Sequence, residues 1–314
     1  MNESIHPRIA RWKNDAKCAV SLYYDDGTDS AFEMAVPSLL RRRIPGTFYL
    51  CCGWFEGDKA PKLARWSLCR EHPEIVLGNH TWGHGGVQNA ADLARELHRN
   101  AEALRAVTGL PPHALVSFGI PGGVPWKVTP EEQAACLAAE NLVLRRRYAP
   151  ENTGGPAGSH KDVLMNTFED ALAVLDRAEA SGGWEPLLFH GVGGDWISFP
   201  AAAHEALLGA IDRRRAEGRL WCGATIAVHK YGAERDAASL APRPAPDGAL
   251  AAFDLTIGTD PARYDEPLTL VADVPAGRDS VALESNGAPV RRVPVLDGRA
   301  VFDVPPRPAS FVLR

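Results

Sequence analysis

The sequence predicts an α/β fold of about seven strands in a parallel sheet, open or closed into a barrel, followed by a small C-terminal antiparallel β module. Two observations indicate this. Short apolar runs alternate with helical patterns through about residue 230, as in folds built on a parallel sheet. From residue 248 the pattern changes to period two, with Asn-Gly and Asp-Gly turn pairs between the runs. We therefore expect two domains, 1–240 and 248–314.

The strands of the parallel sheet are predicted from short apolar segments rich in β-branched and aromatic residues. Between them, 91–109 is the clearest amphipathic helix, and Gly109 is its stop signal. Two further helices are predicted to begin at Thr129 and Thr167, each with an acidic residue three positions later that can complete a capping box. The expected strands are 18–24, 47–52, 74–78, 114–118, 141–145, 185–190 and 220–225.

The C-terminal module follows a Pro-rich segment, 241–248, that we interpret as a linker or extended crossing. We expect the module to serve packing or homo-oligomerisation. A sugar-binding accessory role is the alternative, and the module's few aromatic residues weaken it, because sugar faces stack on rings.

Composition excludes several classes of protein. A net charge of −5 and a pI near 6.1 argue against nucleic acid as a partner. No apolar run approaches the ~20 residues that a membrane span needs. The six cysteines have no CxxC spacing, which favours free thiols in a reducing compartment. The chain as written shows no signal peptide, so we expect a cytoplasmic protein, or an exported one if a leader had been removed.

Two adjacent carboxylates, Asp25 and Asp26, follow the first predicted strand directly. Like charges side by side at the end of a buried strand repel each other and lose hydration. Parallel α/β folds place catalytic groups at the carboxyl ends of their strands, and both aspartates fall at such an end. The pair therefore predicts a site in which some partner compensates this cost.

The segment His80-Thr81-Trp82-Gly83-His84 follows the third predicted strand. In a helical turn, residues four apart point the same way, so both imidazoles can reach one ion. Imidazole and carboxylate together are the ligand set of Zn²⁺ or a similar ion. The pair alone is also consistent with packed or surface histidines. Together with the two aspartates it favours a metal site, with one aspartate as ligand and the other as base.

A third histidine, His190, ends the predicted strand 185–190 and precedes a glycine-rich loop. A histidine there can act as a general acid in a cleft, although alone it is also consistent with a hydrogen-bonded structural residue. His160 and His204 are more simply explained as loop or helix positions.

These segments together resemble the polysaccharide deacetylase family, carbohydrate esterase family four, over about residues 15 to 232. Its aromatic-Asp-Asp-Gly motif is matched by Tyr-Asp-Asp-Gly at 24–27, its His-Ser/Thr-x-x-His motif by 80–84, and its Leu-x-His motif by 188–190. The resemblance implies a distorted (β/α) barrel. It also implies an enzyme that removes acetyl groups from a carbohydrate with the help of a divalent metal ion.

Carried over motif by motif, the resemblance assigns roles to five residues. Asp25 is the implied catalytic base and His190 the implied general acid. The implied metal ligands are Asp26, His80 and His84. They would hold one divalent ion, with Zn²⁺ expected first and Co²⁺, Ni²⁺ or Mn²⁺ as alternatives.

The family's third motif, Arg-x-Pro-aromatic-Gly, is altered here. Pro121 is present, but Gly119 stands where an arginine would support the base carboxylate. Gly122 replaces the aromatic residue, and its backbone N–H can still serve as the oxyanion donor. We hypothesise that one of three arginines after the fifth predicted strand supplies the missing cation. The candidates are Arg145, Arg146 and Arg147.

The family's Asp/Trp motif, which supports the acid histidine, has no clear counterpart. Asp195-Trp196 lies after His190, whereas the usual pair lies before it. Trp196 is a candidate sugar platform, and an aromatic cap on the end of the barrel explains it equally well.

The leading interpretation is a metal-dependent deacetylase acting on N- or O-acetyl groups of an acetylated sugar, oligosaccharide or related small molecule. One alternative is a hydrolase of non-sugar amides or imides, suggested by the altered third motif. The other is a catalytically impaired, carbohydrate-binding homologue, suggested by the missing arginine. The complete Asp-His-His set argues against the first alternative, and the presence of Asp25 and His190 argues against the second.

Overall fold

The computed structural model describes residues 5–145 and 164–314 and divides the chain into two compact units. The parallel-sheet unit is Cys18–Val228. The antiparallel unit combines His229–Arg314 with the described part of Met1–Lys17. Within the described ranges, no helix has both the length and the apolar character that a membrane crossing requires.

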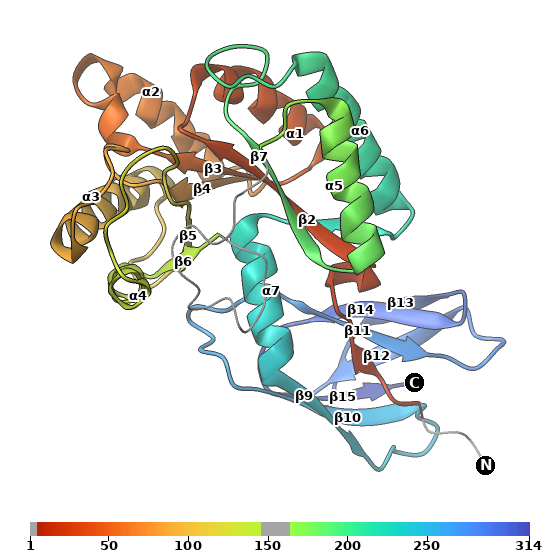
Figure 1. Ribbon diagram of the computed structural model, residues 1–314. Helices are drawn as coiled ribbons and strands as arrows, with labels where there is room; N and C mark the ends of the chain where they lie inside the picture. The colour runs from red at the N-terminus through yellow and green to blue at the C-terminus, as the bar shows by residue number, and fades with distance from the viewer. Residues whose placement is uncertain (1–4, 146–163) are drawn as a thin grey trace. The chain divides into compact units, whose positions relative to one another are not determined.

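The parallel-sheet unit is an α/β structure whose strands pair in the order β6-β5-β4-β3-β2-β7, with β8 also paired to β2 (Figure 1). Among the described residues no ladder joins β6 to β7, so the sheet forms part of a barrel. The strands form at the predicted segments. They are β2 Cys18–Asp25, β3 Gly46–Leu50, β4 Ile75–Asn79, β5 Val116–Phe118, β6 Leu142–Leu144, β7 Trp184–Phe189 and β8 Leu220–Cys222.

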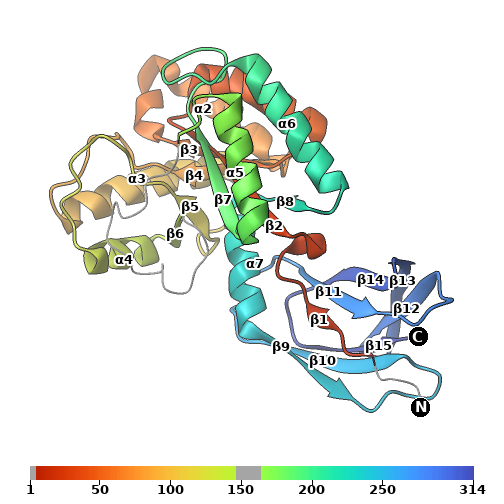
Figure 2. The same cartoon turned by 45° about the vertical axis from the view of Figure 1, so that its right-hand side comes forward.

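Helices cover the outer face of this sheet. Figure 1 shows α1, α5 and α6 beside β2 and β7, and Figure 2 shows α3 beside α4. The capping boxes expected at Thr129 and Thr167 are both present. The helices are α1 Val36–Arg42, α2 Ala60–Ala64, α3 Ala90–Thr108, α4 Pro130–Ala139, α5 Phe168–Ser181, α6 Ala201–Ala216 and α7 Thr225–Ala237, with the π-helix η2 Ala31–Ala35 before α1 and 3₁₀ turns at Lys13–Asp15, Cys52–Phe55, Gly57–Lys59 and Arg65–Arg70.

Side-chain alternation along β2 separates the helix-covered core from the sheet interior. Leu22 and Tyr24 belong to the large apolar core that the helices share, where Tyr24 stacks on Phe48. Tyr23 has the opposite orientation and packs with the ring of Tyr49. Two residues on, Asp25 shares the orientation of Tyr23. The period of the strand therefore directs the first carboxylate into the interior rather than toward the helices.

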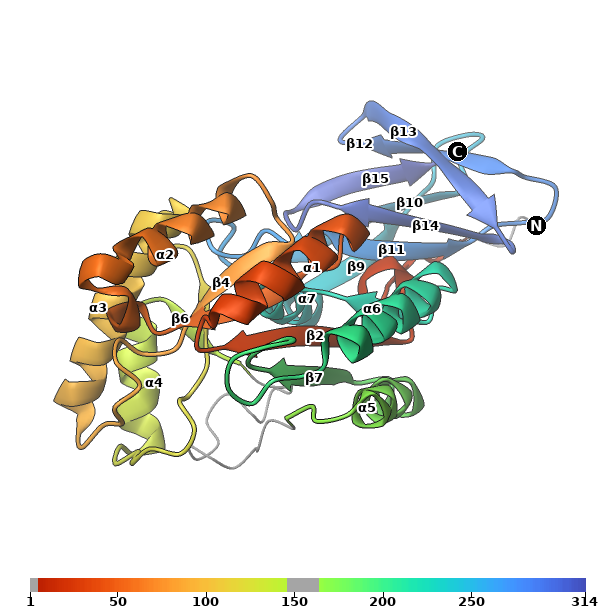
Figure 3. The same cartoon turned by 90° about the horizontal axis from the view of Figure 1, so that it is seen from above.

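The antiparallel unit contains an eight-stranded sheet in the order β1-β11-β14-β13-β12-β15-β10-β9. Figure 3 shows β13 reaching from beside β12 to beside β14. The turns at 286–287 and 297–298 have positive φ at both residues, as expected for tight hairpins. The strands are β1 Arg8–Ile9, β9 Ala238–Arg243, β10 Ala251–Ile257, β11 Leu268–Asp273, β12 Ser280–Ser285, β13 Ala288–Leu296, β14 Arg299–Val304 and β15 Ala309–Leu313.

Two features of this unit differ from the expectation. The first three residues of the predicted linker 241–248 are the end of β9, which pairs with β10 along Ala238–Arg243. Residues 8–9, near the start of the chain, form β1 and pair with β11. Both strands depend on partners that local sequence does not reveal, since an edge strand can be short and polar.

Candidate metal centre

Asp25 and Asp26 lie at the end of β2, and both are buried, with 3% and 5% of their surface exposed. Asp25 is the last residue of the strand, and Asp26 turns away from it with a φ of 73°. This left-handed conformation is unusual for a residue other than glycine, and aspartate is one of the types that tolerate it. The turn directs the two carboxylates differently, so that neighbours in sequence meet different partners.

His80 and His84 follow β4, and both imidazoles face Asp26. The Oδ1 atom of Asp26 lies 3.5 Å from Nε2 of His80 and 3.6 Å from Nε2 of His84. The expected helical turn is absent, because Thr81 and His84 have φ values of 63° and 57°. A bend closed by the His84 N–H, which donates to the Thr81 hydroxyl at 3.2 Å, brings the histidines together instead.

The protonation state of His80 suits a metal ligand. Its Nδ1 lies 2.8 Å from the carbonyl oxygen of Gly119, which can only accept, so Nδ1 carries the proton and Nε2 has a free lone pair. Burial lowers the pKa of His80, although Asp25 and Asp26 oppose that shift and Arg145 adds to it. The neutral tautomer with Nε2 toward Asp26 is therefore favoured.

The residues present fit a divalent ion. Asp26 Oδ1 is buried and has no hydrogen-bond partner among the described residues, although it faces two imidazole nitrogens. The three donor atoms of Asp26, His80 and His84 all lie within 4.8 Å of one another. A tetrahedral ion with ligand bonds of about 2.1 Å separates its donor atoms by about 3.4 Å, close to the spacing found here. Two imidazoles and one carboxylate also leave coordination positions for water and substrate.

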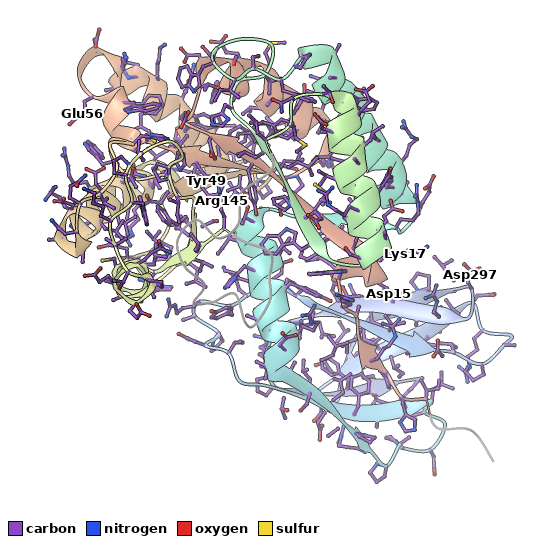
Figure 4. The ribbon with its side chains drawn as sticks, in the orientation of Figure 1. Asp15, Lys17, Tyr49, Glu56, Arg145 and Asp297 are labelled. Atoms are coloured by element: carbon purple, nitrogen blue, oxygen red, sulfur yellow. The ribbon has the colours of Figure 1, made fainter. Side chains whose placement is uncertain are left out.

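Arg145 and Asp25 form a buried bidentate ion pair. Nη1 and Nη2 of the guanidinium each donate to one carboxylate oxygen, the second at 2.7 Å. The guanidinium carbon also lies 4.4 Å from the ring centre of Tyr49, and Figure 4 labels these two residues side by side. Burial alone would raise the pKa of Asp25, but the charge of Arg145, with smaller effects of His80 and His190, lowers it. Asp25 is therefore an ionised carboxylate.

Gly119 makes room for this arginine. A Cβ atom on Gly119 would lie 2.8 Å from the guanidinium carbon of Arg145. The position at which the sequence lacks the family's arginine is therefore filled by an arginine from the next strand. Arg146 and Arg147, the other two candidates, lie outside the described residues.

His190 lies directly after β7 with its Nε2 3.9 Å from Oδ2 of Asp26. Its backbone carbonyl accepts a hydrogen bond from the Thr28 hydroxyl at 3.3 Å. Its Nδ1 is buried and has no partner among the described residues. The side chain is 15% exposed, so this histidine lies at the rim of the candidate centre.

The loop after His190 brings Trp196 to the same carboxylate. The indole Nε1–H donates to Asp26 Oδ2 at 2.8 Å, and 47% of the Trp196 surface is exposed. Trp196 makes an edge-to-face contact with Trp54, whose ring lies 5.6 Å from that of His84. Asp195 instead accepts a hydrogen bond from the backbone N–H of Ser30 at 2.6 Å. Trp196 is thus both exposed and bonded to a candidate ligand.

Of the residues expected to border the substrate, Pro121 is buried and Gly122 is exposed with open space around its Cα. Both lie in the loop after β5. This loop begins at Gly119, whose N–H donates to the carbonyl of Asn79 at 2.9 Å and whose carbonyl accepts from His80. The oxyanion role of Gly122 stays a prediction.

Two buried asparagines, Asn79 and Asn100, were assigned no role from the sequence. Asn79 Oδ1 accepts from the N–H of Thr81 at 2.9 Å and from the side-chain amide of Asn100 at 3.0 Å. Asn100, on α3, also donates to the carbonyl of Leu50 and accepts from the N–H of Cys52. These bonds tie the ends of β3 and β4 to α3 and shape the turn that carries His80. Asn100 could have been found from the sequence, because it is a polar residue on the apolar stripe of the helix predicted at 91–109.

Residues 13–138 match the family model described as polysaccharide deacetylase. No curated protein matches the chain.

Several solved structures are similar to part of this chain at low sequence identity. The peptidoglycan deacetylase PdaC from Bacillus subtilis is 13% identical over 72% of this chain and 96% of its own, with a TM-score of 0.46. A family 4 carbohydrate esterase from Streptomyces lividans, in complex with acetate, is 19% identical over 66% and 93%, with a TM-score of 0.41. A CE4 family pseudoenzyme from Bacillus anthracis is 15% identical over 68% and 66%, with a TM-score of 0.43.

The three motifs lie in the expected order, and the first two fall inside the matched segment. The match over residues 13–138 is to the same family that these motifs resemble.

Proposed function

We propose that the protein is a metal-dependent hydrolase that removes N- or O-linked acetyl groups from a carbohydrate. Asp26, His80 and His84 would hold one divalent ion, and Zn²⁺ suits their imidazole and carboxylate donors best. The observation that carries the proposal is the buried Oδ1 of Asp26, which faces both Nε2 atoms and has no other partner among the described residues. An ion at this point would compensate the burial of that oxygen.

The reaction would be hydrolysis of an acetyl amide or ester. When bound, the ion would polarise the acetyl carbonyl and acidify a water molecule. Asp25 accepts the proton of the attacking water, since the paired Arg145 keeps this carboxylate ionised. The backbone N–H of Gly122 donates to the developing oxyanion. His190 delivers a proton through Nε2 to the leaving amine or alcohol, the acetyl C–N or C–O bond breaks, and acetate is released.

The ion pair between Arg145 and Asp25 favours catalysis over a binding-only role. A lectin-like site needs a surface for the sugar, but it does not need a buried carboxylate held ionised beside a ligand cluster. The exposed ring of Trp196, with Trp54 beside it, supplies an aromatic surface suited to a sugar face. An acetylated sugar or oligosaccharide is therefore the substrate class that we propose.

The test combines metal content with acetate release. The protein is stripped with a chelator and reloaded with Zn²⁺. Bound metal per chain and acetate release from a panel of N- and O-acetylated sugars are then measured. We expect about one ion per chain and acetate release that depends on it. His84→Asn should lose both, because asparagine tolerates the left-handed backbone at 84 but lacks the imidazole.

His113→Asn is the matched control, since His113 is exposed and lies before β5, away from the carboxyl ends of the strands. Absence of metal from the wild type would contradict the proposal. Metal binding without acetate release from any sugar would redirect the proposal to hydrolysis of a non-sugar amide or to a binding role.

A further inference from the structure

The two carboxylate oxygens of Asp26 have different partners. Oδ1 faces the Nε2 atoms of His80 and His84 and accepts no hydrogen bond from any described residue. Oδ2 accepts the indole N–H of Trp196 at 2.8 Å. The carboxylate is 5% exposed, so the indole takes the place of water at Oδ2. The two oxygens of the Asp26 side chain therefore differ: Oδ1 faces the two imidazoles, and Oδ2 is occupied by the indole N–H.

The loop that carries Trp196 is held in place by backbone bonds. The Phe199 N–H donates to the carbonyl of Gly191 at 2.9 Å, and the Gly193 N–H donates to the carbonyl of Phe199 at 2.9 Å. A Cβ atom at Gly191 would lie 2.0 Å from the carbonyl oxygen of Gly194, so the loop closes tightly on itself. These contacts fix the base of the loop independently of the indole.

A second set of bonds anchors the loop to the turn after β2, the strand that ends in Asp25. Ser30 donates from its backbone N–H to Asp195 at 2.6 Å and from its hydroxyl to the carbonyl of Gly194 at 2.8 Å. The Val192 N–H donates to the Ser30 hydroxyl at 3.2 Å. The position of the Trp196 indole relative to Asp26 is therefore set by the fold rather than by the exposed ring.

We propose that Trp196 is a positioning residue that limits Asp26 to one metal-binding oxygen. Its N–H occupies Oδ2, so that only Oδ1 is presented to the ion. This inference rests on the proposed function. A carboxylate free at both oxygens can bind an ion through either or both, and the second bond would fill a position needed by water or substrate. The indole keeps that position open.

The same bond affects His190. Oδ2 of Asp26 lies 3.9 Å from Nε2 of His190. It is the nearer of the two Asp26 carboxylate oxygens to that nitrogen. With the indole N–H already on Oδ2, His190 has a competitor for this oxygen. Its Nε2 is thereby left available to the leaving group of the substrate.

The test uses Co²⁺ as the probe and compares three variants of the full chain. Trp196→Phe keeps an aromatic ring but removes the N–H. Trp196→Gln keeps an N–H donor but removes the ring. Trp126→Phe is the matched control, because the Trp126 N–H donates to Gln133 on α4 at 2.9 Å rather than to a candidate ligand. The Co²⁺ dissociation constant and the visible absorption spectrum, which reports coordination number, are measured for each.

We expect Trp196→Phe to bind Co²⁺ about 10- to 100-fold more weakly than the wild type, as when a metal ligand loses its supporting hydrogen bond. Its visible bands should also weaken, as four-coordinate Co²⁺ gives way to a higher coordination number. Trp196→Gln should bind more tightly than Trp196→Phe, and Trp126→Phe should match the wild type.

Equal affinity and equal spectra for the wild type and Trp196→Phe would overturn the inference while leaving the proposed function intact. A Trp196→Gln variant as weak as Trp196→Phe would overturn it too, since ring packing would then explain the loss. A wild type that binds no Co²⁺ would contradict the proposed function itself. Circular dichroism of the metal-free variants checks that each is folded.

Discussion

The guanidinium of Arg145 occupies the space that a side chain at Gly119 would need, since a Cβ there would lie 2.8 Å from the guanidinium carbon. The two residues follow a pair of neighbouring strands in register, with Phe118 opposite Leu144. Gly119 and Arg145 therefore occupy equivalent positions directly after β5 and β6. An arginine directly after β6 can reach Asp25 because its neighbour, the residue directly after β5, has no side chain.

Gly119→Ala should disturb the proposed base, Asp25, indirectly, by displacing its partner Arg145. The methyl group would collide with the guanidinium of Arg145 and shift it from Asp25. Misplacement of a catalytic group by about 1 Å costs up to about 100-fold in rate, so we expect kcat/KM to fall by about 10- to 100-fold. Gly209→Ala, on α6, is the control, because its Cβ has ordinary contacts. An unchanged rate in Gly119→Ala would show that Arg145 does not need this space.

Exchanging the two residues tests whether the origin of the arginine matters. Arg145→Gly alone leaves Asp25 buried without its cation, and breaking a buried pair costs about 3–5 kcal/mol of unfolding free energy. Gly119→Arg combined with Arg145→Gly should recover part of the stability and part of the rate. Urea unfolding and kcat/KM measure the two effects. A double variant no better than Arg145→Gly would mean that only β6 can present the guanidinium correctly.

Asn100→Ala should weaken both the fold and metal binding. The substitution leaves the buried carbonyl of Leu50 and the N–H of Cys52 without their side-chain partner and removes one bond from Asn79. Each such group costs about 1–3 kcal/mol, so we expect a loss of several kcal/mol. Zn²⁺ affinity should fall as well, because Asn79 shapes the turn that carries His80. Exposed Gln88→Ala is the control. A stable variant with weakened metal affinity would separate the two effects.

Glu234 predicts a pH dependence of stability in the antiparallel unit. This residue on α7 is fully buried, and burial raises its pKa to about 8 from 4.5. The folded state therefore keeps a proton that the unfolded state has released. The resulting stability is fully present below about pH 4.5 and is lost as the pH rises toward about 8.

Glu234→Gln removes this titration but keeps the side-chain oxygen that accepts the N–H of Glu266 at 3.0 Å. The thermal midpoint of the wild type should therefore fall relative to that of the variant between pH 5 and pH 8, in the pH window set by the raised pKa. A constant difference over this range would show that Glu234 is ionised in the folded protein.

The sequence predicts well what depends on local pattern. The strand segments, the capping boxes at Thr129 and Thr167 and the hairpin turn at 286–287 all follow from short-range periodicity or turn chemistry. Asp25, Asp26 and His80 could be grouped because parallel strands place their carboxyl ends at one edge. In each case, a rule about neighbours along the chain was sufficient.

The sequence could not show what depends on lateral pairing or on loop direction. The choice of Arg145 needed the register of β5 and β6, which is a non-local contact. The bond from Trp196 to Asp26 depends on how a loop anchored at Ser30 folds back, whereas the sequence suggested a sugar platform or an aromatic cap on the end of the barrel. The helical turn predicted for 80–84 was wrong, because left-handed residues brought the imidazoles together by another route.

Asp26 and His84 both have left-handed backbone, with φ values of 73° and 57°. Aspartate, asparagine and histidine are enriched in this conformation, whereas bulky and β-branched residues are strained in it. The residue at each position must therefore both supply a donor atom for the ion and tolerate a left-handed backbone. An attempt to convert the centre to a thiolate-rich or carboxylate-rich one, through cysteine or glutamate at 26 or 84, would strain the turn before any ion bound. Engineering a different metal preference would have to begin with the loop and only then change the ligands.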